Sequence, residues 1–211
     1  KRPLSLNLDF ARDQTLLGHR SLNLLNANQD PTMLRSVLFL DVARDYIPAV
    51  RANFARVVIN GESWGVYVNQ QTFSAEFERE TFKTTNGTRW KSPNNSVGGG
   101  FSYLGDDIAL YRRWYEMKGA DNLAAWRALR RVTQVLHDTP AGELERALAP
   151  LMDVDEVLRY LALHIVLVNN DGYWRDGSDF NIYLNAQGRF LVTLHDANEG
   201  FRAGGRAGGA A

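Results

Sequence analysis

Alternation of apolar and polar positions predicts β-strands in the first half of the chain. Apolar residues alternate with Ser, Asn and Asp over positions 4–10, and a similar short pattern follows at 21–24. This is the period expected of half-buried strands. Two runs of strand-forming residues, 54–59 and 64–68, flank Asn60-Gly61, a dipeptide that strongly favours a two-residue hairpin turn. The pattern therefore predicts a strand-rich N-terminal lobe.

Two helices are expected to interrupt these strands. Asp30-Pro31 favours a helix start, because Asp caps free N–H groups and Pro suits the first helical position. This helix would run to about Tyr46 with one apolar face formed by Met33, Val37 and Leu40. Ser74 is expected to cap a second, short helix with two glutamates in its first turn, which suits the helix dipole.

After a further predicted strand at 88–91 and a loop at 92–105, apolar residues recur at helical spacing. Helices are expected over 106–116, after Asp121 and after Thr139-Pro140. A fourth begins at Asp153, where Glu156 three residues later suggests a capping box. Its predicted buried face comprises Val157, Leu161, Ile165 and Val168. Strands followed by helices predict an α+β fold with a helical C-terminal lobe.

A last β-hairpin is predicted near the end of the chain. The runs 180–184 and 189–194 are separated by Asn185-Ala186-Gln187-Gly188, as in a short hairpin loop. Asn181 and Asp196 lie about equally far from Gly188. They are therefore expected to be level at the open end of the hairpin, and an even-length loop would put them on one face.

Composition narrows the possible functions. Lys plus Arg equals Asp plus Glu at 24 each among 211 residues, and 45% of the residues are hydrophobic. This length suggests one domain, or two small lobes that share a cleft, and the balanced charge gives no indication of nucleic-acid binding. No apolar run reaches membrane-spanning length, and the absence of cysteine excludes disulfides and thiol nucleophiles. Residues 203–211 are rich in Gly and Ala and are predicted to be a disordered tail.

Three oxygen-bearing side chains, Asp171, Asn181 and Asp196, fall at the ends of predicted elements. A loop carboxylate followed by Asn and Asp on either side of a hairpin is how protein kinases arrange a base and two Mg²⁺ ligands. Taken alone, Asp171 fits a plain turn residue, and Lys91 fits either a solvated lysine or one beside an anion site. Asn181 is more informative, because an amide inside an apolar strand needs a partner or a function.

Other motifs have a plain structural interpretation beside a functional one. Residues 176–179 fit a turn better than a calcium loop, because the EF-hand spacing is missing. His164 and His195 have no ligand at zinc-site spacing. Gly98-Gly99-Gly100 fits a flexible loop, although its backbone N–H groups could cradle a phosphate.

A series of sequence blocks follows one order along residues 1–201. They are KRPLSLNLDF, the segment 22–67, SYLGDD, YRRWYEMK, the segment 153–173, FNIYLN and HDANEGF. The segment 22–67 contains an Asp-Pro-x-x-x-Arg helix start and a hairpin that ends in Trp-Gly-x-Tyr. Together these blocks resemble the CotH family of spore-coat-type protein kinases.

The resemblance implies an atypical kinase fold over residues 1–202 that transfers the γ-phosphate of ATP to Ser or Thr of a surface or coat protein, with Mg²⁺ or Mn²⁺. Lys91 matches the ATP-phosphate lysine and Asp171 the catalytic aspartate, while Asn181 and Asp196 match the metal site. Arg35 matches the motif arginine and is grouped with Lys91 as cofactor-binding, without a defined role. The family also implies an extracellular, cell-surface or spore-surface location.

The chain departs from the family pattern at three places. Asn69-Gln70 stands where Glu-Gln is expected, so Glu76, Glu78 or Glu80 would have to supply the carboxylate that positions the lysine. His195-Asp196 replaces the usual Trp-Asp. Gly/Ala-rich sequence follows where family members continue with helices, so the helical lobe is expected to be incomplete. The alternative function is a non-catalytic coat or cell-surface assembly module that keeps the kinase-like fold.

Overall fold

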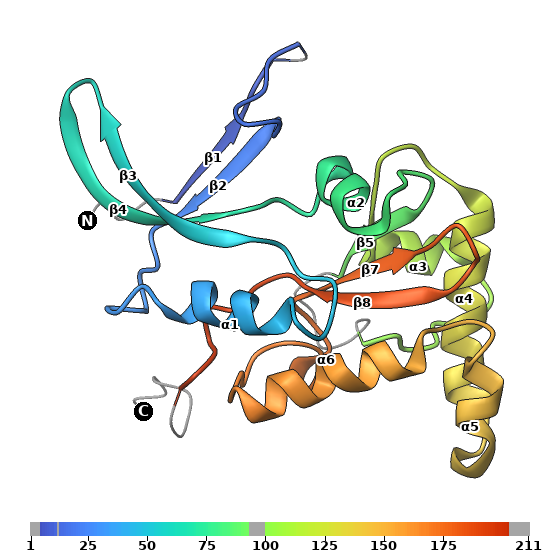
Figure 1. Cartoon of the computed structure of the whole chain (residues 1–211). Helices are drawn as coiled ribbons and strands as arrows, with labels where there is room; N and C mark the ends of the chain where they lie inside the picture. Colours follow the sequence, from blue (N-terminus) through green and yellow to red (C-terminus); the bar gives the residue numbers. More distant parts are fainter. Residues whose placement is uncertain (1–4, 12, 93–99, 203–211) are drawn as a thin grey trace. The chain divides into compact units, whose positions relative to one another are not determined.

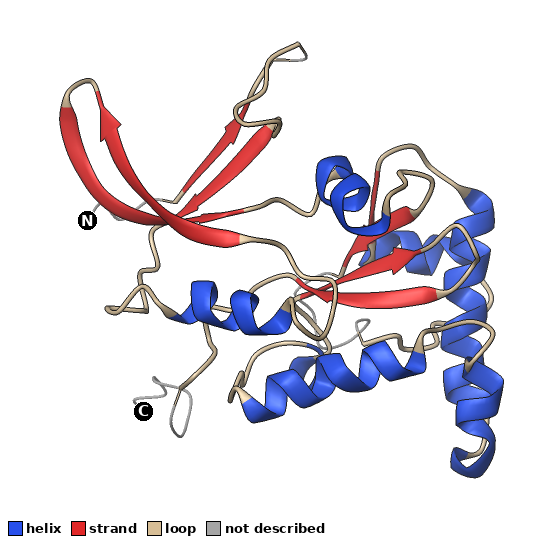
Figure 2. Cartoon of the chain, viewed as in Figure 1, coloured by secondary structure: helices blue, strands red, loops and turns tan. Residues whose placement is uncertain are grey.

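The computed structural model describes residues 5–11, 13–92 and 100–202, which divide into two compact units. Of these described residues, those up to 85 and 197–201 belong to the first unit, and those from 86 to 196 with 202 belong to the second. Each unit contains a four-stranded antiparallel sheet, and helices complete both units (Figures 1 and 2). The predicted α+β class is confirmed. The predicted tail, 203–211, and most of the glycine motif at 98–100 lie outside the described residues.

The sheet of the first unit has the strand order β1-β2-β4-β3, formed by Leu6–Asp9, Ser21–Leu25, Glu62–Gln70 and Ala52–Ile59. The β3–β4 hairpin turns at Asn60 and Gly61, whose φ angles of 51° and 80° are the left-handed values that this dipeptide adopts readily. Leu24, Val57 and Tyr67 form a small core on one face of the sheet. The hairpin predicted at Asn60-Gly61 is therefore confirmed.

The first helix begins later than predicted. Helix α1 spans Arg35–Ala43, because Asp30 organises a turn instead of capping a helix directly. Its Oδ1 accepts from the backbone N–H of Thr32 at 3.0 Å, and its Oδ2 accepts from that of Arg35 at 2.9 Å. Met33 lies between them in the left-handed region with a φ of 60°. The predicted helix start at Pro31 is wrong, and Met33 lies outside the helix.

Two further segments complete the first unit. Helix α2 spans Ala75–Phe82 and is capped by Ser74, as predicted. Residues 197–201 return to α1, where the rings of Phe201 and Phe39 meet edge to face at 6.2 Å. A Cβ on Gly200 would lie 2.7 Å from the Phe39 ring, so this contact needs glycine. The end of the HDANEGF block therefore has a packing role.

The sheet of the second unit has the order β6-β5-β7-β8, formed by Glu116–Lys118, Thr88–Lys91, Phe180–Leu184 and Phe190–Leu194. One face is apolar and carries the cross-strand row of Trp90, Ile182 and Val192. Trp90 packs edge to face on Trp126 at 5.8 Å, and Phe101 stacks on Phe180 at 5.8 Å. These rings form the core of the unit, and the opposite face of the sheet carries Lys91, Asn181 and Thr193 beside the buried Tyr183 and Leu191.

The helices of the second unit are α3 (Ile108–Trp114), α4 (Leu123–Asp138), α5 (Ala141–Leu148), α6 (Val154–Val166) and the short α7 (Tyr173–Asp176). The helix predicted over 106–116 is shorter, because Glu116 already belongs to β6. Asn122, not Asp121, caps α4, since the Asp121 carboxylate accepts from the Trp126 indole at 2.8 Å. Within the described part of the chain, no helix is long and apolar enough to cross a membrane.

The buried face of α6 also differs from the prediction. Glu156, Tyr160, Leu163 and His164 are buried, whereas the side chains of Ile165 and Val168 are 62% and 40% exposed. Helix α6 is apolar around most of its circumference, so its sequence periodicity does not select one face. The Tyr160 and His164 rings pack against each other on the buried face of α6, with their centroids 4.4 Å apart.

The last hairpin forms as predicted, but its register is different. Asn185 hydrogen-bonds to Arg189 through its backbone N–H, so three residues form the loop instead of four. Asn181 is consequently paired with Thr193. Asp196 lies three residues beyond the position level with Asn181, after β8 has ended. The expectation that Asn181 and Asp196 are level is therefore wrong, because the loop has an odd length and the turn is centred on Gln187 instead of Gly188.

Candidate functional site

A row of polar residues crosses the second sheet on the face opposite its aromatic core. Lys91 pairs in register with Glu116 on β6 and with Asn181 on β7, and Asn181 pairs with Thr193 on β8. Directly opposed residues of antiparallel strands share a face and have Cβ atoms about 5 Å apart. Glu116, Lys91, Asn181 and Thr193 therefore form one continuous row, here called the polar row. The structure thus brings together two predicted site residues, Lys91 and Asn181, that are far apart in sequence.

The surroundings of the polar row are positively charged. Lys118 lies two residues after Glu116 on β6, and its Nζ is 2.6 Å from Glu116 Oε1. Burial, with smaller contributions from the charges of Lys91 and Lys118, lowers the pKa of His195 to about 4. Both lysines therefore lie near the neutral imidazole that follows β8. This combination suits an anionic ligand better than a cationic one.

Two members of the polar row are buried despite their polarity. Asn181 is 3% exposed, and its Nδ2 donates to the backbone carbonyl of Leu194 at 3.1 Å. Thr193 is 1% exposed, and its Oγ1 has no hydrogen-bond partner among the described residues. An unsatisfied buried hydroxyl costs about 1–3 kcal/mol. The row thus offers a polar atom that a ligand or water would satisfy.

Asp171 lies in a tightly held loop between α6 and α7. Its backbone N–H donates to Asn169 Oδ1 at 3.3 Å, and its own Oδ1 accepts from the N–H of Gly172 at 2.9 Å. The indole of Trp174 donates to the Asn169 carbonyl at 2.9 Å. The loop backbone is therefore held at Asn169 and Asp171, and the partly exposed Asp171 carboxylate accepts one hydrogen bond, from the next residue.

Gly172 fits this loop for two reasons. Its φ of 113° lies in the region that favours glycine, and a Cβ would stand 3.0 Å from the His164 ring. Burial lowers the pKa of His164 to about 4, so the imidazole under the loop is neutral. The next residue, Tyr173, packs edge to face on Phe180 at 5.1 Å. The Asp171 loop is thereby attached to the start of the strand that carries Asn181.

The remaining predicted residues fall elsewhere. Arg35 belongs to the first unit, where its Nη1 donates to the Gln29 carbonyl at 3.3 Å and its Nε lies 3.9 Å from Asp30. Asp196 is partly exposed just after β8. The metal-binding role of Asp196 and the nucleotide-binding role of Arg35 stay predictions.

Asn69 stands where the family pattern has a carboxylate, and its side chain contacts another amide. Asn69 Nδ2 donates to Asn53 Oδ1 at 3.0 Å. Of the three suggested substitutes, Glu80 accepts from Gln71 at 2.9 Å and Glu78 is buried. Burial alone would raise the pKa of Glu76, but hydrogen bonds from Ser74 and the backbone, together with the charges of Arg79 and Arg20, lower it. All three belong to the first unit. Sequence reasoning missed Glu116, the carboxylate that stands directly opposite Lys91 in the sheet.

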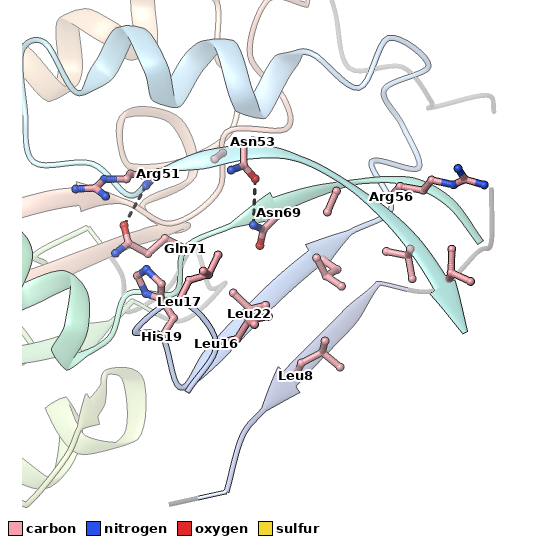
Figure 3. A pocket seen from close by; sticks show the side chains of 15 residues that line it. Leu8, Leu16, Leu17, His19, Leu22, Arg51, Asn53, Arg56, Asn69 and Gln71 are labelled. Atoms are coloured by element: carbon pink, nitrogen blue, oxygen red, sulfur yellow. Dashed lines mark hydrogen bonds between the residues drawn. The ribbon is translucent and has the colours of Figure 1, made fainter. Parts of the chain in front are cut away.

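The first unit has a groove of about 500 Å³ on the face of its sheet that carries Leu24 and Val57. Leu8, Leu16, Leu17 and Leu22 form apolar walls, and the hydrogen-bonded pairs Arg51–Gln71 and Asn53–Asn69 form a polar edge (Figure 3). A pocket of this size with few polar groups is typical of sites for small organic molecules. No local sequence pattern indicates this groove, because its lining combines residues of four strands and of the β1–β2 loop.

The chain belongs to the CotH family: the family model described as CotH kinase protein matches residues 1–210. Among curated proteins, the inner spore coat protein H of Bacillus subtilis (strain 168) is 23% identical over 175 residues. That match covers 80% of this chain and 47% of the relative, so the chain spans about half of the relative's length. The predicted family is confirmed.

The residues of the second unit fit a metal–polyphosphate ligand. Lys91 supplies an ammonium group, Asn181 an amide, and Asp171 and Asp196 carboxylates. In the described ranges, no three His, Asp or Glu side chains gather into a metal cluster. Amide and carboxylate oxygens are ligands that suit Mg²⁺, which takes one or two protein carboxylates and completes its shell with phosphate and water oxygens. The buried hydroxyl of Thr193 adds an unsatisfied polar atom on the same face.

Proposed function

We propose that this chain is a metal-dependent protein kinase that transfers the γ-phosphate of ATP to Ser or Thr of a surface or coat protein. The observation that carries the proposal is the pairing of Lys91 with Asn181 on the cationic face of the second sheet. Family membership supports the same activity. The name of the Bacillus relative, a spore coat protein, supports a coat or surface location.

Each residue has a defined part in this proposal. Bound Mg²⁺ or Mn²⁺ would neutralise charge on the phosphates. Asn181 and Asp196 would hold the metal, and Lys91 would pair with phosphate oxygens as a point charge. Asp171 would orient the acceptor hydroxyl and accept its proton. The hydrogen bonds that hold the Asp171 loop supply the positioning on which this type of transfer depends.

A second candidate function is a non-catalytic assembly module of a coat or cell surface. Asn69 favours it, because the amide replaces the carboxylate that family members use near the lysine, and its side chain is engaged with Asn53. The two functions differ in one requirement. A kinase must bind metal and ATP together, whereas an assembly module needs neither.

The test is calorimetric titration of ATP into the protein with Mg²⁺ or Mn²⁺, for the wild type and for Asp196→Asn. We expect metal-dependent binding that the substitution weakens by at least about tenfold, the scale of a lost charged contact. Asp155→Asn serves as a matched control, because this exposed carboxylate on α6 lies outside the proposed site. Absence of ATP binding by the wild type with either metal would reject the kinase function.

A further inference from the structure

Lysine is rare in this chain, and its positions are not scattered. Of the 24 basic Lys and Arg side chains, only four are lysines, at positions 1, 83, 91 and 118. Two of the four, Lys91 and Lys118, lie on adjacent strands of one sheet. Lysine presents a compact point charge on a flexible stem, whereas arginine presents a planar fork. Half of the lysines of an arginine-rich chain therefore place their ammonium groups on one pair of strands.

The strand register places both lysines on the face that carries the polar row. Lys91 pairs with Glu116, and Lys118 follows Glu116 by two residues, so the lysines are diagonal neighbours. Diagonal cross-strand positions lie about 7–8 Å apart, which long side chains bridge. Glu116 accepts from Lys118 at 2.6 Å and stands opposite Lys91. The Glu116 carboxylate is therefore ion-paired with Lys118 and lies across the strand pair from Lys91.

The same two strands carry a third cation on this face. Arg89 pairs in register with Lys118, two residues before Lys91. Three cations and one carboxylate from β5 and β6 thus share one face, beside the buried amide of Asn181. Like charges in neighbouring positions destabilise a sheet. A ligand with several negative charges would offset the repulsion between Lys91 and Lys118 more fully than a singly charged anion.

We infer that Lys118 is a second phosphate-binding residue, which together with Lys91 makes the site selective for the number of phosphates on a nucleotide. This inference rests on the proposed function, because it assigns a further contact to the same nucleotide. Lys91 and Lys118 would contact different oxygens of one polyphosphate, and Glu116 holds Lys118 until the ligand arrives. The affinity contributed by Lys118 should therefore grow from AMP to ADP to ATP.

The experiment measures the dissociation constants of ATP, ADP and AMP with Mg²⁺ by calorimetry, for the wild type, Lys118→Met and Lys118→Arg. A hydrogen bond to a charged group supports a loss of about ten- to a hundredfold in ATP affinity for Lys118→Met. ADP should lose less, and AMP should be unchanged. Lys118→Arg keeps the charge but not the compact ammonium group, so an intermediate loss is expected.

Lys83→Met is the matched control, because it removes the same charge from helix α2, where Lys83 Nζ donates to the Glu80 carbonyl at 2.7 Å. The dissociation constants of ATP, ADP and AMP for Lys83→Met should equal those of the wild type. An equal loss for ATP and AMP in Lys118→Met would show a structural effect and overturn the inference. If the wild type binds ATP and Lys118→Met binds it with the same affinity, the inference about Lys118 is overturned, but the kinase proposal is not. Failure of the wild type to bind ATP would reject both.

Discussion

Glu156 is a buried carboxylate that should make the stability of the second unit depend on pH. The sequence suggested a capping box in which Glu156 would reach back to the N–H of Asp153. That N–H instead donates to the carbonyl of Phe190 at 2.9 Å. Glu156 is left 9% exposed, and its Oε1 has no hydrogen-bond partner among the described residues. Burial, with a smaller contribution from Asp153, raises the pKa of Glu156 to about 8.

The direction and size of the effect follow from proton linkage. The folded protein holds the Glu156 proton more tightly than the unfolded chain, whose pKa is near 4.5. The stabilisation is therefore fully present below pH 4.5 and is lost as the pH rises through about 8. Because one pKa unit corresponds to about 1.4 kcal/mol, the free energy of unfolding should fall by on the order of 3 kcal/mol between pH 5 and pH 8.

The measurement is urea unfolding at pH 5, 6, 7 and 8, followed by the fluorescence of the buried Trp90 and Trp126. Glu156→Gln cannot ionise, so its free energy of unfolding should fall less over this range and exceed that of the wild type at pH 8. Glu145→Gln makes the same change at an exposed position of α5 and should follow the wild-type curve. Equal pH dependence in Glu156→Gln and the wild type would refute the assignment of this effect to Glu156.

Two further predictions concern the Asp171 loop. Gly172→Ala should destabilise the protein both through its positive φ and because the new Cβ would press on His164. Gly188→Ala is the control, since it has a positive φ but no close neighbour, and it should lower the unfolding free energy by about 1 kcal/mol. Gly172→Ala should lower it by at least about 1 kcal/mol more, and equal losses in urea unfolding would contradict the close contact. Asp171→Ala should leave ATP affinity nearly unchanged and lower phosphate transfer by about 10² or more, measured as labelled γ-phosphate entering a Ser-containing acceptor. Equal incorporation by wild type and variant would remove Asp171 from the catalytic role.

The elements that the sequence predicted well are those with a strong local cause. The β3–β4 hairpin follows from Asn60-Gly61, and Ser74 caps α2 as its side-chain chemistry suggests. Predictions from local residue preferences were wrong where the capping side chain forms a different hydrogen bond. Asp30 bonds to Thr32 and so delays α1, and Asp121 bonds to the Trp126 indole and leaves the cap to Asn122.

The candidate site could be predicted only in part, for a topological reason. Asp171, Asn181 and Asp196 stand near one another in sequence, around a hairpin with a visible loop. Lys91 joins them only because β5 pairs with β7. The residue pattern of neither strand predicts which distant strand it pairs with. Glu116 and Lys118 were missed for the same reason. Their strand, β6, has three residues, and the helix predicted over 106–116 already included the first of them, Glu116.

The polar row bears directly on the choice between a kinase and an assembly module. A fold kept only for assembly gains stability when buried polar side chains in a sheet are replaced by apolar ones of similar shape, because an unsatisfied buried hydroxyl costs about 1–3 kcal/mol. Thr193 is such a residue, since valine has nearly its shape and Oγ1 has no partner among the described residues. The loss of the family carboxylate at position 69 argues the other way. This argument for an assembly module is weakened by Glu116, which places a carboxylate directly opposite Lys91 on the neighbouring strand. A buried hydroxyl, a buried amide and two diagonally neighbouring lysines on one face favour the proposed polyphosphate ligand over a role in packing alone.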